Sequence, residues 1–340
     1  MFSRQKPHIR FLGGGKLLGR GKDKCAYDHT ENIMCRTKTK PRKVPIKRDR
    51  VALVMESHVY QQEKASAKLL TKRVPKDRLE QVCTMLDAKL ACSDTIAPLS
   101  CHQKDSKLVT ATAQRGSARY KFKTLKDLGY ALANLVYALW VFKAHKLVHN
   151  DIKLENLVLV DDKLGHQVFK VIDMSSMNTR SGVEARIRRS DKAFLEESQD
   201  SSYCFPKAHG VWMTRRGLVA KLLKKHHADQ ESVMEVLIDN IDMFRLALCV
   251  DNLRILNPKL DVKSIQSHLV ASPGDFAHNP KMYRARLVVD DLCEAGLGKK
   301  PKSSQNESFA SLQAFYSAIL STCNLDLPPV LTEYLPKHAS

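Results

Sequence analysis

The chain has 340 residues, 43% of them hydrophobic, which is enough for one two-lobed domain followed by a tail. It contains no stretch of about 18–20 uncharged apolar residues and opens on no apolar leader, so we expect a soluble or at most peripheral protein. Nine cysteines, an odd number, are scattered without a Cys-x-x-Cys pair. This argues against a disulfide framework and a structural zinc site, and favours a reduced, cytosolic protein.

Lysine and arginine number 56 against 36 acidic residues, which gives a formal net charge of +20. Residues 1–50 hold fifteen basic and four acidic residues, and further basic clusters lie at Arg186–Arg189 and Lys221–Lys225. Such clusters favour polyanionic partners, namely acidic lipid, inositol polyphosphates or, less strongly, nucleic acid. Simple solubility is the alternative explanation.

In the first third of the chain, a polar and basic segment at 29–50 predicts a loop. Short apolar runs predict strands at Val51–Met55 and Leu108–Gly116. Helix-forming residues predict helices at 58–72 and at Asp77–Leu90.

Further along, apolar residues spaced by three and four predict a helix over 124–145 with one apolar stripe. Two apolar strands flank a predicted turn at Asp161–Gly165. The run Val233–Val250 is apolar around most of its circumference, which predicts a buried helix. More helices are expected within 251–299 and at Phe309–Cys323.

The most informative residues follow the helix predicted over 124–145. The pattern His149-x-Asp151-x-Lys153-x-x-Asn156 places a carboxylate, a cation and an amide in one loop, and Asp173 ends the second apolar strand. Phosphoryl transfer needs a carboxylate to orient the attacking hydroxyl, a cation near the moving phosphoryl group, and oxygen ligands for a metal ion.

This pattern resembles the catalytic loop of eukaryotic-type protein kinases, with Asp173 at the position of their metal-binding aspartate. The resemblance implies an α+β, two-lobed kinase-like fold with a small β-rich lobe and a larger helical lobe. It assigns 1–112 to the small lobe and 113–299 to the large lobe, with the catalytic loop at 149–156. Residues 300–340 then form a linker and a last helix.

The resemblance also implies roles for the site residues. Asp151 would be the general base, and Lys153 would stabilise charge on the γ-phosphoryl group of ATP. Asn156 and Asp173 would bind Mg²⁺ or Mn²⁺. Val158 would lie beneath the adenine.

Two more residues are expected to hold the loop in place. Asp242, in the predicted buried helix, would accept hydrogen bonds from the backbone of the catalytic loop, because a buried carboxylate needs such donors. His149 is expected to anchor the loop structurally.

In the small lobe, Gly19 and Gly21 resemble a glycine-rich phosphate loop, although Lys24 stands where the third glycine would be. A flexible basic loop is an equally good interpretation of these residues. The upstream run Gly13–Gly15 is a rival candidate.

The lysine that anchors ATP has two candidate positions. Val-Pro-Ile-Lys47 resembles Val-Ala-Ile-Lys, and its distance in sequence from Glu63 suits a Lys–Glu ion pair. The better strand, however, carries Val54 where the lysine belongs. We favour Lys47; if it does not act, a basic residue from elsewhere must substitute.

Several positions depart from the family pattern. Asn150 replaces the arginine that usually answers an activation-loop phosphate, so control by loop phosphorylation is not expected. Met174 and Ser175 follow the metal-binding aspartate in place of Phe and Gly, and Lys207 replaces a glutamate. These departures describe a divergent kinase, similar to bacterial effector kinases and viral kinases.

The resemblance implies an atypical protein kinase that transfers the γ-phosphate of ATP to Ser, Thr or Tyr of a protein substrate. A pseudokinase binding module and an inositol phosphate or lipid kinase are the alternatives. An inositol polyphosphate or phosphoinositide on the basic surface would be a regulatory partner. The expected location is the cytoplasm or a membrane periphery, or the host cell for a secreted bacterial effector.

Overall fold

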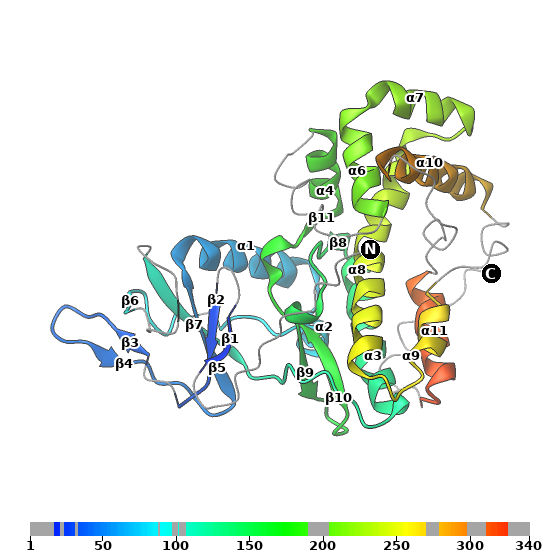
Figure 1. Cartoon of the computed structure of the whole chain (residues 1–340). Coiled ribbons are helices and arrows are strands. Elements are labelled where there is room, and N and C mark those ends of the chain that lie inside the picture. The colour runs from blue at the N-terminus through cyan, green and yellow to red at the C-terminus, as the bar shows by residue number, and fades with distance from the viewer. Residues whose placement is uncertain are drawn as a thin grey trace. The chain divides into compact units, whose positions relative to one another are not determined.

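A computed structural model describes residues 17–20, 24–30, 33–87, 89–96, 101, 107–189, 204–269, 279–297 and 311–325. Within these residues the protein is a mixed α+β structure in which ten α-helices accompany small antiparallel sheets (Figure 1). No helix in these ranges is both long enough and apolar enough to cross a membrane.

The chain divides into two compact units. The smaller unit comprises Met1–Arg73, Thr84–Gly116 and Asp173–Ser175, and the larger comprises Val74–Cys83, Ser117–Ile172 and Ser176–Ser340. Each unit has its own buried apolar clusters and is described separately below.

A four-stranded antiparallel sheet of order β1-β2-β5-β7 forms the centre of the small unit. Its strands are β1 (Leu17–Arg20), β2 (Lys24–Tyr27), β5 (Arg50–Glu56) and β7 (Leu108–Gln114). Helix α1 (Ser57–Arg73) follows β5 directly. The strands predicted from the two apolar runs and the helix predicted at 58–72 are therefore confirmed.

The segment predicted as a loop at 29–50 contains two short strands, β3 (Met34–Cys35) and β4 (Arg42–Lys43). Strand β3 also pairs with β6 (Thr95–Ile96), so the three strands form a second small sheet.

Two disulfides, Cys25–Cys101 and Cys35–Cys92, join strands of the small unit to segments 76 and 57 residues further along the chain. The prediction of a chain without disulfides was wrong. Its basis was the lack of closely spaced pairs, but the sheet topology brings together cysteines that are far apart in sequence. Of the other cysteines whose side chains the structure describes, four are free and buried: Cys83, Cys249, Cys293 and Cys323.

In the large unit, helix α3 (Leu125–Ala144) coincides with the helix predicted over 124–145. It begins at a reciprocal capping box, in which the Thr124 hydroxyl accepts from the Asp127 N–H and the Asp127 carboxylate accepts from the Thr124 N–H. Helix α8 (Gln230–Leu256) contains the predicted buried helix and is extended at both ends.

The helix predicted at Asp77–Leu90 is shorter in the structure, where α2 spans Lys76–Val82. The chain leaves the helix because Cys83 forms a β-bridge to Val171. Helix α2 falls within the range predicted for the small lobe but belongs to the larger unit. There Leu79 is buried, and the Arg78 guanidinium donates to the Tyr137 hydroxyl at 2.6 Å.

Two short strand pairs lie around the central loop of the large unit. Strands β9 (Leu157–Asp161) and β10 (Gln167–Val171) form the predicted hairpin, and Gly165 adopts a φ of 82° in its turn. Strand β8 (Leu147–Val148) pairs with β11 (Asn178–Thr179). Short 3₁₀ turns occupy Leu154–Asn156 and Met174–Ser176.

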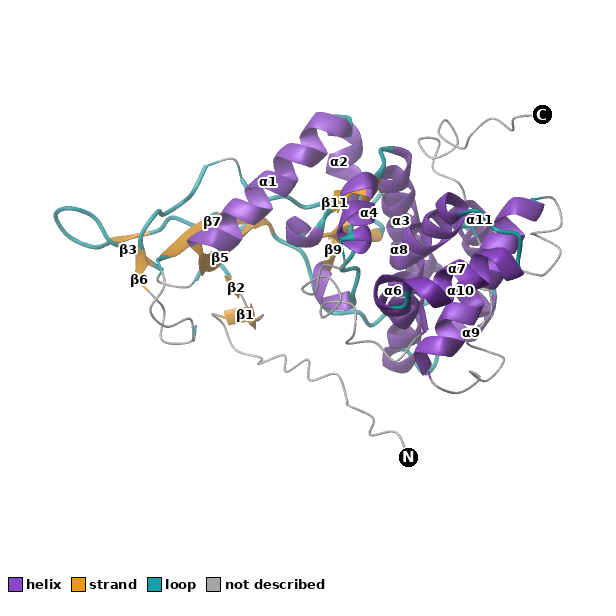
Figure 2. Ribbon diagram, turned by 90° about the horizontal axis from the view of Figure 1, so that it is seen from above, coloured by secondary structure: helices purple, strands orange, loops and turns teal. Residues whose placement is uncertain are grey.

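Six more helices complete the described part of the large unit. They are α4 (Arg180–Arg188), α6 (Cys204–Thr214), α7 (Arg216–Lys225), α9 (Val262–Ser267), α10 (Pro280–Leu297) and α11 (Leu312–Thr322). Helix α10 lies against α6, α7 and α8, as the view in Figure 2 shows for the first two. The helices predicted near the C-terminal end are thus present.

Candidate active site

The loop that follows β8 is fixed by a carboxylate of helix α8. The backbone N–H groups of His149 and Asn150 donate to the two oxygens of Asp242, each at 2.9 Å. Asn150 has a φ of 64°, a left-handed conformation that asparagine tolerates better than most residues. The prediction that Asp242 accepts hydrogen bonds from this loop is confirmed.

Burial raises the pKa of Asp242 above its ordinary value, although His149 and the two N–H donors act in the opposite direction. Burial thus disfavours the charged form of the Asp242 carboxylate that holds the loop, and the N–H donors of the loop compensate for part of this cost. His149 itself is completely buried and accepts the Asp151 N–H at 3.3 Å, which agrees with its expected anchoring role.

Asp151, Lys153 and Asn156 meet through their side chains within the large unit. The Lys153 ammonium donates to Asp151 Oδ2 at 2.7 Å. The Asn156 amide nitrogen donates to the same oxygen and to the Asp151 carbonyl, both at 2.8 Å. The carboxylate of Asp151 is thus fixed from two sides, while about a quarter of its side chain stays exposed to solvent.

These contacts also orient Asn156. Because its amide nitrogen faces Asp151, the amide oxygen is the atom left to coordinate a cation. Its backbone carbonyl accepts the Ile172 N–H at 2.9 Å, which ties the loop to the end of β10.

A residue that the sequence interpretation missed supports the same turn. The buried hydroxyl of Tyr120 lies 2.6 Å from the Leu154 carbonyl and 2.9 Å from the Leu157 carbonyl. These carbonyls flank the short turn that carries Asn156. A lone tyrosine before a predicted helix gives no signal for this role, because its partners are more than thirty positions away.

In the small unit, the cation that meets Glu63 is Lys24. Its ammonium pairs with the buried Glu63 carboxylate of α1 and lies 2.8 Å from Asp173 Oδ1. Lys47, which the sequence favours for this pair, lies exposed in the turn before β5. The Lys47–Glu63 pair is therefore corrected to Lys24–Glu63.

Strand register explains the change. Strand β2 pairs with β5 so that Lys24 is opposite Met55, at the end of β5 from which α1 leaves. Lys24 therefore stands close to the first turns of α1, which carry Glu63. Sequence inspection placed Lys24 at a glycine position of a phosphate loop and so did not consider it as a partner for Glu63.

Asp173 adopts a φ of 59°, which is unusual for a residue other than glycine and marks a constrained backbone. Burial by itself raises the pKa of this carboxyl, but the nearby Lys24 ammonium and the hydrogen bonds from Ser175 outweigh burial and lower the pKa. The Ser175 hydroxyl donates to Asp173 Oδ1 at 2.6 Å. Asp173 is thus an anionic oxygen donor at neutral pH.

The other predicted small-lobe and nucleotide-binding residues are only partly described. Gly19 lies in β1, opposite Ala26, whereas Gly21 and the rival run Gly13–Gly15 fall outside the described residues. Val158 is half-buried on β9, paired with Lys170. Lys207 lies in α6, and its side chain is outside the described part of the chain.

Metal-binding capacity is limited among the described side chains. Within these ranges no three His, Cys, Asp or Glu residues gather as a metal cluster. Asn156 of the large unit offers an amide oxygen and Asp173 of the small unit a carboxylate, and each is a hard oxygen donor of the kind that Mg²⁺ prefers.

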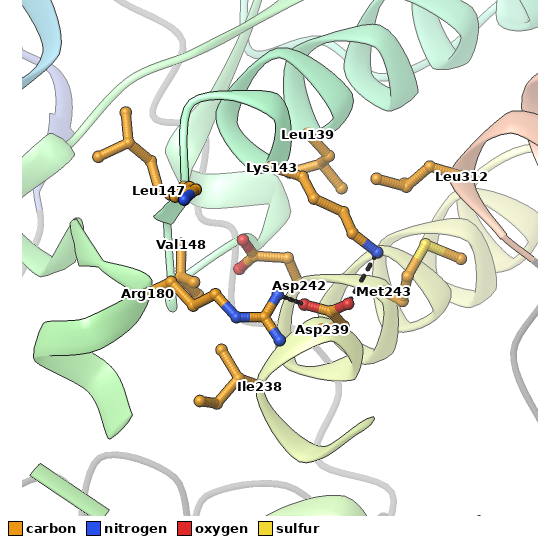
Figure 3. A pocket seen from close by; sticks show the side chains of 11 residues that line it. Leu139, Lys143, Leu147, Val148, Arg180, Ile238, Asp239, Asp242, Met243 and Leu312 are labelled. Atoms are coloured by element: carbon orange, nitrogen blue, oxygen red, sulfur yellow. Dashed lines mark hydrogen bonds and ion pairs between the residues drawn. The ribbon is translucent and has the colours of Figure 1, made fainter. Parts of the chain in front are cut away.

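Behind the loop, the large unit contains a small pocket in which three charged residues meet (Figure 3). Arg180 of α4 and Lys143 of α3 both pair with Asp239 of α8, the latter at 3.0 Å. The lining is completed by Leu139, Lys146, Leu147, Val148, Ile238, Asp242, Met243 and Leu312.

Comparison of the sequence with protein-family models and with curated proteins gives no match.

Proposed function

We propose that this protein is an atypical protein kinase with a two-lobed kinase-like fold, transferring the γ-phosphate of ATP to a Ser, Thr or Tyr hydroxyl of a protein substrate. The observation that carries the proposal is the arrangement around Asp151. A partly exposed carboxylate, fixed by Lys153 and Asn156, lies in a loop whose backbone is bound by Asp242. Such fixed geometry suits a group that must orient a hydroxyl for attack.

Each residue of the site has a separate chemical role in this proposal. Asp151 accepts the hydroxyl proton at its carboxylate and orients the hydroxyl oxygen toward the phosphorus atom. Lys153, already bonded to Asp151, stabilises negative charge on the phosphoryl oxygens. Asn156 and Asp173 would hold Mg²⁺ or Mn²⁺, which when bound with ATP neutralises charge on the phosphates.

The role of the cation that binds the nucleotide phosphates is assigned to Lys24 in place of Lys47. Glu63 fixes the position of the Lys24 ammonium, which leaves the remaining ammonium hydrogens to donate to phosphate oxygens. Gly19 and Gly21 are proposed to let backbone N–H groups approach the same phosphates, and Val158 to contact the adenine.

The test is phosphotransfer by purified protein with labelled ATP, Mg²⁺ or Mn²⁺, and a mixture of protein substrates. Asp151→Asn should lower kcat by about 10²–10⁴-fold, the usual contribution of a positioned acid–base group. The matched control is Glu155→Gln, since Glu155 is exposed in the same loop. Equal activity of wild type and Asp151→Asn would exclude Asp151 as the base.

Two alternatives have defined outcomes in the same assay. Stabilisation by ATP without transfer to any acceptor would indicate a pseudokinase binding module. Transfer to inositol phosphates or phosphoinositides, and not to protein, would indicate a small-molecule kinase.

The basic surface provides a specific reason to include these acceptors. Helix α7 and its N-terminal flank expose five basic side chains, while Val219 and Leu222 on the other face of the helix are buried. The exposed residues are Arg215, Arg216, Lys221, Lys224 and Lys225. We propose that this face binds a polyphosphorylated anion that regulates the enzyme. Calorimetry with inositol hexakisphosphate at about 0.15 M salt tests this proposal. A binding heat of the Arg216→Gln/Lys221→Gln variant equal to that of wild type would exclude this face as the binding site.

A further inference from the structure

Within the large unit, the segment that begins at Ser176 is held in place by an arginine that the sequence interpretation did not consider. Arg180 is the first residue of α4, and it follows β11 directly. Its backbone N–H donates to the Lys146 carbonyl at 2.9 Å. The two residues before it pair with β8, Asn178 with Val148 and Thr179 with Leu147.

The side chain of Arg180 reaches α8. Its guanidinium pairs with Asp239 and lies 3.7 Å from Glu235, one turn earlier on the same helix. A cation in the first turn of a helix gains nothing from the helix dipole, which favours negative charge there. The stabilisation of Arg180 in this place therefore comes from the carboxylates of α8.

Asp239 and Asp242 lie three positions apart on α8, so they occupy one side of the helix. Asp242 binds the backbone of His149 and Asn150, whereas Asp239 binds the Arg180 guanidinium and the Lys143 ammonium. Figure 3 shows Arg180 and Lys143 converging on Asp239, with Asp242 beside it.

Arg180 therefore joins the two structures that hold the catalytic loop. Its backbone continues the pairing of β11 with β8, the strand that leads into His149. Its side chain is bound to α8, the helix that supplies Asp242. About 29% of its side chain is exposed, so the ion pair is shielded from much of the solvent.

We infer that Arg180 is a positioning residue for Asp151. It fixes β8 against α8, so that the loop that follows β8 holds the Asp151 carboxylate in a reactive orientation. Both partners of the ion pair, Arg180 and Asp239, are unmodified side chains, so this positioning requires no phosphorylation of the chain. The expected effect of Arg180 on kcat rests on the proposed phosphotransferase function. Its effect on the position of the loop rests on the structure of the large unit.

The kinetic experiment compares Arg180→Gln, Arg180→Lys and wild type after treatment with a protein phosphatase. Because small misplacement of a reacting group can cost about 10²-fold, Arg180→Gln should lower kcat by about 10- to 100-fold. The KM for ATP should stay within about twofold, since the interaction lost acts on orientation and not on nucleotide binding. Arg180→Lys, which keeps the charge, should recover part of kcat. The matched control is Arg188→Gln, because Arg188 lies on the same helix and pairs with Glu184, one turn earlier on that helix.

Hydrogen exchange of the His149 and Asn150 amides gives a second readout that does not need activity. Their exchange should become faster in Arg180→Gln and stay at the wild-type rate in Arg188→Gln. Unchanged exchange at these amides, or an unchanged kcat with active wild type, would overturn the inference. If wild type shows no transfer at all, the proposed function fails while the exchange rates still decide whether Arg180 braces the loop.

Discussion

Lys24 on β2 forms an ion pair with Glu63 on α1, and this pair takes the place that the sequence assigns to Lys47. We predict that Lys24→Met weakens ATP binding by about 10- to 100-fold, because a hydrogen bond to a charged group contributes about 1.5–3 kcal/mol. Lys47→Met should bind ATP like wild type. Calorimetric titration with ATP and Mg²⁺ compares the two variants.

Loss of Lys24 also leaves the buried Glu63 carboxylate without this partner, which by itself lowers stability. The double variant Lys24→Met/Glu63→Gln removes both charges and separates folding from binding. Recovery of wild-type ATP affinity in the double variant would contradict the anchoring role of Lys24.

Asp173 is the carboxylate expected to bind the metal that accompanies ATP. We predict that Asp173→Asn abolishes the part of ATP-induced thermal stabilisation that depends on Mg²⁺ or Mn²⁺, because an amide binds these ions more weakly than a carboxylate. Thermal-shift titrations with metal and with a chelator isolate this part. Asp161→Asn, an exposed carboxylate at the end of β9, is the control and should keep the metal-dependent increment. The same increment in Asp173→Asn would assign the metal to other ligands.

The two disulfides should stabilise the small unit. We predict that reduction, or the variants Cys25→Ser and Cys35→Ser, lowers its stability by about 2–5 kcal/mol, because each bond closes a long loop. Thiol titration of the unfolded protein should find four more free thiols after reduction than before it. Equal thiol numbers would show that these cysteines are reduced, as the sequence led us to expect. Cys293→Ser, which alters a free buried cysteine of the large unit, is the matched control and should leave the reduction-dependent change unaltered.

Stability of the large unit should depend on pH through Asp290 of α10. Burial raises the pKa of Asp290 to about 6, although Arg286 at 2.9 Å acts in the opposite direction. Between about pH 4 and 6 the folded protein then binds more protons than the unfolded chain, so stability falls as pH rises through this range. The fall attributable to Asp290 is about 2–3 kcal/mol, and Asp290→Asn should remove it.

The neighbouring Asp291 provides a control of opposite sign. Burial raises its pKa, but His226 and Lys225 outweigh burial and lower it, so Asp291 contributes stability that is lost as pH falls through its lowered pKa. Urea unfolding at several pH values measures both effects. In Asp290→Asn the free energy of unfolding should decrease less as pH rises than it does in wild type. In Asp291→Asn the free energy of unfolding should decrease less as pH falls. The same pH profile for Asp290→Asn and wild type would contradict the raised pKa.

Local features were predictable from the sequence because their causes lie within a few residues. The apolar spacing and the Thr124–Asp127 capping box define α3, and the apolar run of β5 defines a central strand. The spacing of Asp151, Lys153 and Asn156 also predicted that they could act together, since a short loop keeps them close.

Other features depended on tertiary structure, because they join residues far apart in the chain. Only the pairing of β2 with β5 places Lys24 rather than Lys47 beside Glu63, and only the sheet topology brings Cys25 to Cys101. The ion pair of Arg180 with Asp239 likewise depends on how α4 packs near α8. Sequence patterns record local periodicity and chemistry, whereas the choice among several available cations or cysteines is made by strand register and helix packing.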